Sequence, residues 1–300
     1  MREKRIKLSP QLRTDLTGYA FLLPNFLGCL LFTFIPVLCS LVFSFTDWDY
    51  TKGLGNWNFN GLTNYIEMWT DDWFLASLKN TLVYTAAVVP VTICLALVLS
   101  VIIDKYCLAK LPICLAMLMP HLSSMVAISI VWVMMYSSFG PITQLVRWFG
   151  VEDVPKWLAD YTWAMPAVIL MMIWSKVGYA IMIYTSAIQG LPAELYEAAD
   201  IDGASEVSKF FKLTVPFLSP TTFYLLITNI ISSFQVFASI QIMTGGGPGN
   251  STSVLVYYIY RSAFGYYKMG YASAMAWILF VMIFAVTLIQ WRGQKRWVGY

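Results

Sequence analysis

The sequence predicts an all-α membrane protein with six transmembrane helices. Of its 300 residues, 59% are hydrophobic and 12% are charged, whereas a soluble domain has about 25% charged residues. Six apolar stretches each have about the 20 residues that a helix needs to cross the bilayer. Their apolar character is continuous and does not alternate, which favours helices over the strands of a barrel. A soluble domain and a disordered chain are both excluded.

The first apolar stretch covers residues 18–45 and follows a basic start. It is much longer than the roughly 7–15 apolar residues of a signal peptide. We therefore expect a retained first helix, bent at Pro24 or Pro36, because proline removes a backbone hydrogen bond. Five similar stretches follow, and they cover residues 80–103, 111–136, 163–188, 217–243 and 270–291.

Six helices place both termini on one side of the lipid bilayer. With a cytoplasmic N-terminus, twelve Lys and Arg lie in inside segments, six lie outside and Lys176 lies within a span. The positive-inside rule thus predicts a cytoplasmic N-terminal segment 1–17, a transmembrane domain 18–291 and a cytoplasmic C-terminal tail 292–300. A net charge of +3 is too small to indicate a nucleic-acid partner.

The segment between the fourth and fifth stretches, residues 190–216, has clear local signals. Pro192 suits the first position of a helix, and Glu197 lies towards its N-terminal end, where the helix dipole favours negative charge. Gly203 can adopt the left-handed conformation that ends a helix. A second short helix is expected after it, before Pro216 breaks the chain. The segment therefore predicts a cytoplasmic helix–turn–helix elbow that lies parallel to the membrane.

Within this elbow, Glu197-Ala198-Ala199, Gly203 and the closing Leu-Thr-Val-Pro216 resemble the EAA loop of bacterial ATP-binding-cassette importer permeases. The family usually has Leu where this chain has Val before the proline. In that family the elbow is a coupling helix that docks on an ATPase subunit. The resemblance implies ATPase-coupling roles for Glu197, Ala198, Ala199, Asp202 and Gly203. The alternative is an amphipathic connector with no partner.

A second motif narrows the resemblance. The glycine-rich segment 244–252, followed by Tyr257, Tyr258 and Arg261, is similar to the sugar permeases of the maltose and glycerol-3-phosphate type. This resemblance implies an importer for a sugar or oligosaccharide, acidic sugars included, that works by alternating access in the bacterial cytoplasmic membrane. Its implied partners are a second permease, two ATPase subunits and an extracytoplasmic solute-binding protein. The chain has no Walker-type loop, so we expect no enzyme activity and no cofactor in it, with ATP and Mg bound by the ATPase.

Polar side chains inside the apolar stretches indicate where substrate contacts lie, because polar groups in hydrocarbon face the bundle interior or a wet cavity. The resemblance places the substrate contacts on the third, fourth and fifth helices, at His121, Ser175, Lys176, Tyr179, Asn229 and Ser233. Two alternatives stay open. The serines, Ser232 among them, can instead bond a neighbouring helix or their own backbone, and His121 can be a packed histidine.

Lys176 is the most informative of these residues, because an unpaired ammonium within a span is costly and no acidic residue lies deep in any span. Our hypothesis is that it faces water and binds a carboxylate or phosphate oxygen of the substrate. Two other functions compete with the importer. A secondary transporter coupled to protons lacks an intramembrane carboxylate, although sodium coupling stays open. A membrane enzyme is least favoured, because one histidine and no clustered acids offer little for catalysis.

Overall fold

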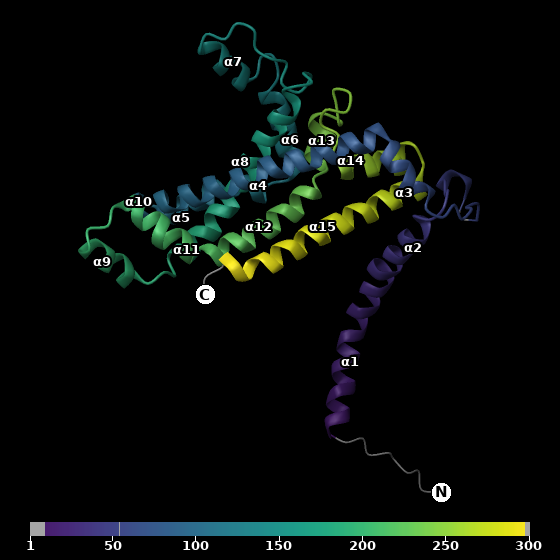
Figure 1. Ribbon diagram of the computed structural model, residues 1–300, viewed down its shortest axis with the longest axis horizontal. Coiled ribbons are helices and arrows are strands. Elements are labelled where there is room, and N and C mark those ends of the chain that lie inside the picture. The colour runs from purple at the N-terminus through teal and green to yellow at the C-terminus, as the bar shows by residue number, and fades with distance from the viewer. Residues whose placement is uncertain (1–9, 54, 298–300) are drawn as a thin grey trace. The chain divides into compact units, whose positions relative to one another are not determined.

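The computed structural model describes residues 10–53 and 55–297, and this part of the chain is almost entirely helical (Figure 1). It contains no strand, only two isolated β-bridges, so the predicted all-α class is confirmed. Four of its helices are long and apolar enough to cross a membrane, or six if each of two bent pairs counts as one span. Residues 1–9 of the predicted N-terminal segment and 298–300 of the tail lie outside the described residues.

The chain divides into two compact units. The first comprises residues up to Tyr65 together with Ser262–Trp277. Its helices are α1 (Pro10–Cys29) and α2 (Ile35–Phe43), joined by a π-helical turn at Leu30–Phe34. The helix therefore continues through Pro24, and its regular hydrogen bonding shifts in the turn directly before Pro36.

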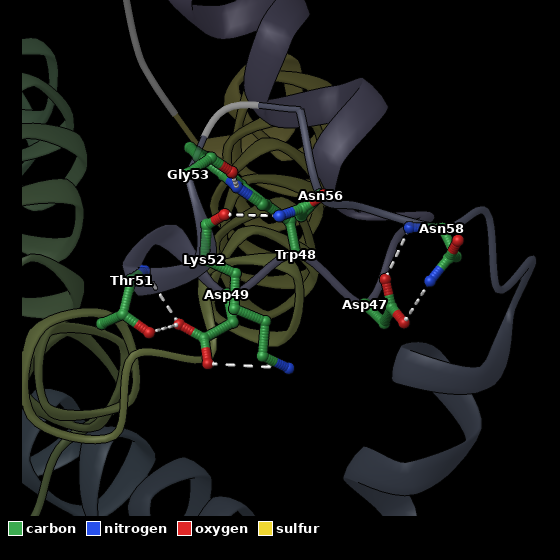
Figure 2. A network of polar contacts seen from close by, with 8 residues as sticks. All are labelled: Asp47, Trp48, Asp49, Thr51, Lys52, Gly53, Asn56 and Asn58. Atoms are coloured by element: carbon green, nitrogen blue, oxygen red, sulfur yellow. Dashed lines mark hydrogen bonds and ion pairs between the residues drawn. The ribbon is translucent and has the colours of Figure 1, made fainter.

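The loop after α2 is held by short-range polar contacts (Figure 2). Asp47 accepts hydrogen bonds from the Asn58 backbone nitrogen at 2.7 Å and from its Nδ2 at 3.3 Å. These bonds, the backbone one above all, lower the pKa of the Asp47 carboxyl. Asp49 accepts from the nitrogen and hydroxyl of Thr51 and so starts a short 3-10 turn, Tyr50–Lys52. The two aspartates therefore serve this loop's own backbone.

The second unit comprises Ile66–Arg261 and Ile278–Tyr300. Helix α4 (Asp72–Tyr106) packs along α8 (Ala164–Ile188), while α5 (Lys110–Leu122) also lies on α8 and α12 (Ser219–Phe234) lies on α4. Tyr84, Val88 and Met171 are fully buried where α4 meets α8. Helix α3 (Thr63–Glu67) spans the boundary between the two units. The helices of the second unit are α4 (Asp72–Tyr106), α5 (Lys110–Leu122), α6 (Met125–Met135), α7 (Pro141–Trp148), α8 (Ala164–Ile188), α9 (Ala193–Ile201), α10 (Glu206–Lys209), α11 (Val215–Phe217), α12 (Ser219–Phe234), α13 (Ala238–Met243) and α14 (Leu255–Tyr260). Helix α15 (Met269–Trp297) begins in the first unit and ends in the second.

Two predicted spans are not continuous helices. The stretch 111–136 forms α5 and α6, which meet at a bend of 95°. At the end of α5 the Ser123 nitrogen and hydroxyl both bond the Met119 carbonyl, at 3.2 and 2.9 Å, and the backbone of Ser123 then turns to an extended conformation (φ −78°, ψ 156°), which ends the helix. The stretch 217–243 forms α12 and α13, with a break at residues 235–237. By contrast, α8 begins one residue after the predicted start at 163 and ends at the predicted 188.

Within the second unit, the two motifs identified in the sequence lie at opposite ends of α4. The elbow helices α9 and α10 lie beyond its C-terminal end (Figure 1). The glycine-rich loop 244–252 lies at its N-terminal end, where Asn80 Nδ2 donates to the carbonyls of Asn250 and Ser253 at 2.8 and 2.9 Å. Ser77 adds a hydroxyl contact of 2.8 Å to Ser253. The two motifs are thus about the length of one long helix apart.

Candidate functional site

The elbow forms a compact turn between two short helices. Helix α9 ends in a Schellman motif, in which Ala204 N donates to Ala199 O at 2.9 Å and Gly203 N donates to Asp200 O at 3.1 Å. Gly203 has φ 72°, a conformation that costs little only for glycine. Ser205 then caps α10 through its hydroxyl. A π-helical turn at Phe210–Thr214 leads to a 65° bend before α12.

An ion-pair network joins the two elbow helices to α4. Lys209 is buried, and its Nζ lies 2.5 Å from Asp200 of α9 and 2.7 Å from Glu206 of α10. Glu206 also pairs with Lys105 near the C-terminal end of α4. This network was not predicted from the sequence. Its only local signal is the Glu206–Lys209 spacing of three, since the other contacts depend on the folded turn.

An open cavity of about 470 Å³, called here the elbow cavity, lies between the elbow and the ends of α4 and α8, and the predicted coupling residues lie on the surface of the elbow. Glu197 is exposed at the rim of the cavity, and Ala198, Asp202 and Gly203 are also exposed, while Ala199 is half-buried. Two apolar side chains are far more exposed than is usual, Ile201 at 88% and Val207 at 67%. Exposed apolar side chains beside a carboxylate favour a protein partner on this surface.

The network gives a prediction about the elbow. Lys209→Met should leave Asp200 without its cation and Glu206 with Lys105 alone, and we expect the uptake that the importer resemblance implies to fall several-fold while the protein still inserts. Lys212→Met is the matched control, because Lys212 is exposed and makes no ion pair among the described residues. Uptake assays and membrane expression levels measure both. Equal uptake in the two variants would show that the network does not hold the elbow.

A second cavity, of about 290 Å³, opens between α8 and α12 and is called here the α8–α12 cavity. Lys176 lies at the middle of α8, and its Nζ donates to the hydroxyls of Ser232 at 2.8 Å and Ser233 at 3.2 Å. The α8–α12 cavity is lined by His121, Lys176, Tyr179, Tyr224, Thr228, Asn229 and Ser232. The cavity thus gathers hydrogen-bonding groups from three helices within an apolar bundle.

Aromatic rings form part of the wall of the α8–α12 cavity. His121, at the end of α5, stacks on Tyr179 of α8 with ring centroids 4.8 Å apart and planes 19° apart. The hydroxyls of Tyr179 and Tyr224 are 3.2 Å apart. Flat rings beside hydroxyl groups suit a ligand that has both apolar faces and hydroxyls, as a sugar ring does.

Four of the six predicted substrate contacts line this cavity: His121, Lys176, Tyr179 and Asn229. Ser233 is buried behind it and contacts the ammonium of Lys176. Ser175 does not line the cavity, because one step along a helix turns a side chain by about 100°. It is 1% exposed, and its hydroxyl has no partner among the described residues.

Two residues that line the cavity were not predicted from the sequence. Tyr224 and Thr228 precede Ser232 at intervals of four, so all three share one face of α12. This spacing was the available signal. A tyrosine and a threonine near the start of an apolar stretch resemble interface residues, however, and only the neighbouring α8 shows that they face a cavity.

Gly178 lets α5 approach α8 closely enough to form this wall. A Cβ atom on Gly178 would overlap the carbonyl oxygen of Met117. Met117 lies one helical turn before His121, and Gly178 directly precedes Tyr179, so the close approach brings the two stacked rings together. The stack therefore depends on a residue that has no side chain.

These features define a multi-pass α-helical membrane protein with an elbow at one end and a polar cavity among its helices. The family model for the "Binding-protein-dependent transport system inner membrane component" matches residues 108–297, more than half of the chain. The chain belongs to this family. The predicted permease class is thereby confirmed, and the family match favours neither an ion-coupled transporter nor an enzyme.

Individual proteins show the same relationship. The chain is 35% identical to the probable ABC transporter permease protein YesP of Bacillus subtilis (strain 168), over 98% of this chain and 96% of that protein. It is 31% identical to the lactose transport system permease protein LacF of Rhizobium radiobacter, over 94% and 95%. A crystal structure of a bacterial alginate ABC transporter, in complex with an alginate pentasaccharide-bound periplasmic protein, contains a chain with the same fold (TM-score 0.81, 23% identity, 96% and 97% covered).

Proposed function

We propose that this chain is the permease subunit of an ATP-driven importer for a sugar or oligosaccharide. The α8–α12 cavity carries this proposal, because it combines stacked rings with hydroxyl, amide and ammonium groups at the middle of a membrane helix. Likeness to a lactose permease over nearly the whole chain supports a sugar as the cargo. An external solute-binding protein would deliver the sugar.

The elbow supplies the mechanical connection in this proposal. Glu197 and the exposed apolar side chains Ile201 and Val207 would dock on an ATPase subunit, which binds ATP and Mg. Closure of two ATPase subunits would move α9 and α10, and the 65° bend joins this motion directly to α12. Because α12 supplies four lining residues, its movement would open the cavity first to the outside and then to the inside.

Orientation and assembly complete the proposal. The excess of Lys and Arg in alternate segments supports cytoplasmic termini and a cytoplasmic elbow. A single permease offers one half of a transport pathway, so we expect a second, homologous permease subunit beside this one, with one ATPase under each. The substrate-facing roles of His121, Tyr179 and Asn229 belong to the same proposal.

Reconstitution tests the proposal. A tagged chain should copurify from native membranes with a second permease and an ATPase subunit. In proteoliposomes that contain this complex, we expect labelled sugar to enter only with ATP on the elbow side and binding protein on the other. Uptake that is driven by a sodium gradient without ATP would overturn the proposal in favour of an ion-coupled transporter.

A further inference from the structure

The walls of the α8–α12 cavity contain a cation and no carboxylate. The three helices that form it are α5, α8 and α12, and the sequence has no Asp or Glu between Asp104 and Glu152, between Asp160 and Glu194, or after Glu206. In the described part of the chain, Lys176 has no ion-pair partner. Its positive charge is therefore not compensated by any side chain that the structure describes.

The hydrogen bonds of Lys176 position its ammonium group but leave its charge in place. Nζ has three N–H donors, and Ser232 and Ser233 accept two of them at 2.8 and 3.2 Å. Both acceptors are neutral hydroxyls. A charge away from bulk water is costly without a counter-ion. A ligand with a negatively charged oxygen would supply the counter-ion that Lys176 lacks.

The other residues that line the cavity limit which anions fit. The stacked rings of His121 and Tyr179, the Tyr224 hydroxyl and the Thr228 hydroxyl offer little to a small inorganic ion. They suit a ring that has C–H faces and several hydroxyls. At about 290 Å³ the cavity is at the small end of ligand sites, which run from about 300 to 1,000 Å³, and this size suits one sugar ring.

We propose that the α8–α12 cavity selects anionic sugars, an inference that rests on the proposed function. The negatively charged oxygen of the sugar pairs with Lys176, and the ring lies against the His121–Tyr179 stack. A carboxylate and a phosphate share this chemistry. The anion also neutralises Lys176, so the cavity can close around its cargo without isolating a charge.

Uptake by the reconstituted importer tests this inference with three variants and three cargoes. The variants are Lys176→Met, which keeps the length without the charge, Lys176→Arg, which keeps the charge, and Ser186→Ala as the matched control. Ser186 lies on α8, and its hydroxyl bonds only its own helix, at the Met182 carbonyl. The cargoes are a uronate oligosaccharide, a sugar phosphate and a neutral oligosaccharide, each with ATP and the binding protein present.

We expect wild type and Ser186→Ala to take up at least one of the two anionic cargoes. Lys176→Met should lower that uptake roughly tenfold or more, because a charge-assisted contact is lost, and Lys176→Arg should retain most of it. Comparison of the uptake of the uronate oligosaccharide with that of the sugar phosphate shows which anion is carried. ATP-driven uptake of the neutral cargo alone, or equal anion uptake by Lys176→Met and wild type, would overturn anion selection while leaving the sugar importer intact. ATP-independent uptake of every cargo would instead overturn the proposed function.

Discussion

Glu197→Arg is expected to abolish ATP-coupled uptake while the protein still inserts into the membrane. Glu197 is exposed on α9, at the rim of the elbow cavity, and makes no ion pair among the described residues. Its carboxylate is therefore available to a partner, and an arginine there would place a like charge against any basic residue that the carboxylate meets. The measurements are uptake in proteoliposomes and copurification of the ATPase subunit.

A charge reversal elsewhere controls for a general effect of charge. Glu152 is exposed in the segment between α7 and α8, on the predicted outer side, so Glu152→Arg should leave uptake and ATPase binding near the wild-type level. Normal coupled uptake in Glu197→Arg would contradict the docking role of α9. Loss of uptake in both variants would point to the charge of the whole protein and would also contradict it.

Gly178→Ala should destabilise the protein and displace the aromatic wall of the α8–α12 cavity. The added Cβ would overlap the Met117 carbonyl, so α5 has to move away from α8. Overpacking of this kind typically costs about 1–3 kcal/mol. Because the same contact brings His121 onto Tyr179, uptake should fall as well. A thermal melt of the detergent-solubilised protein and an uptake assay measure the two effects.

Gly28→Ala is the matched control, since Gly28 also lies in a long apolar helix and a Cβ there would meet nothing within 4 Å. We expect its melting temperature to equal or slightly exceed that of the wild type, because alanine is the better helix former. If both variants melt at the wild-type temperature, the helices α5 and α8 are further apart than the structure indicates.

Some elements could be predicted from sequence because their signals are local. The stretch that forms α8 is a continuous apolar run, so its ends were predicted to within one residue. The turn at Gly203 also rests on local backbone preference. The bend between α5 and α6 was missed, since hydropathy reports the length of an apolar run and not its direction. Pro120 marks the place only once the helix is known to end there.

The α8–α12 cavity could be predicted only in part, because which residues line it depends on how the neighbouring helices pack. Lys176 was predicted as a lining residue because a lysine ammonium in hydrocarbon is costly, and Asn229 was predicted because it lies on the polar face of its helix. Ser175 is adjacent to Lys176 in sequence but lies on the buried face of α8. Tyr224 and Thr228 needed the position of α8 before their role was visible. The Lys209 network likewise appears only when the elbow is folded.

Two adjacent serines on α12 have a consequence for how that helix can rotate. Their side chains project about 100° apart around the helix axis, yet both hydroxyls reach the Lys176 ammonium, at 2.8 and 3.2 Å. A rotation of α12 that withdrew Ser232 would bring Ser233 nearer. The Lys176 ammonium would thus keep a hydroxyl partner in either orientation of α12.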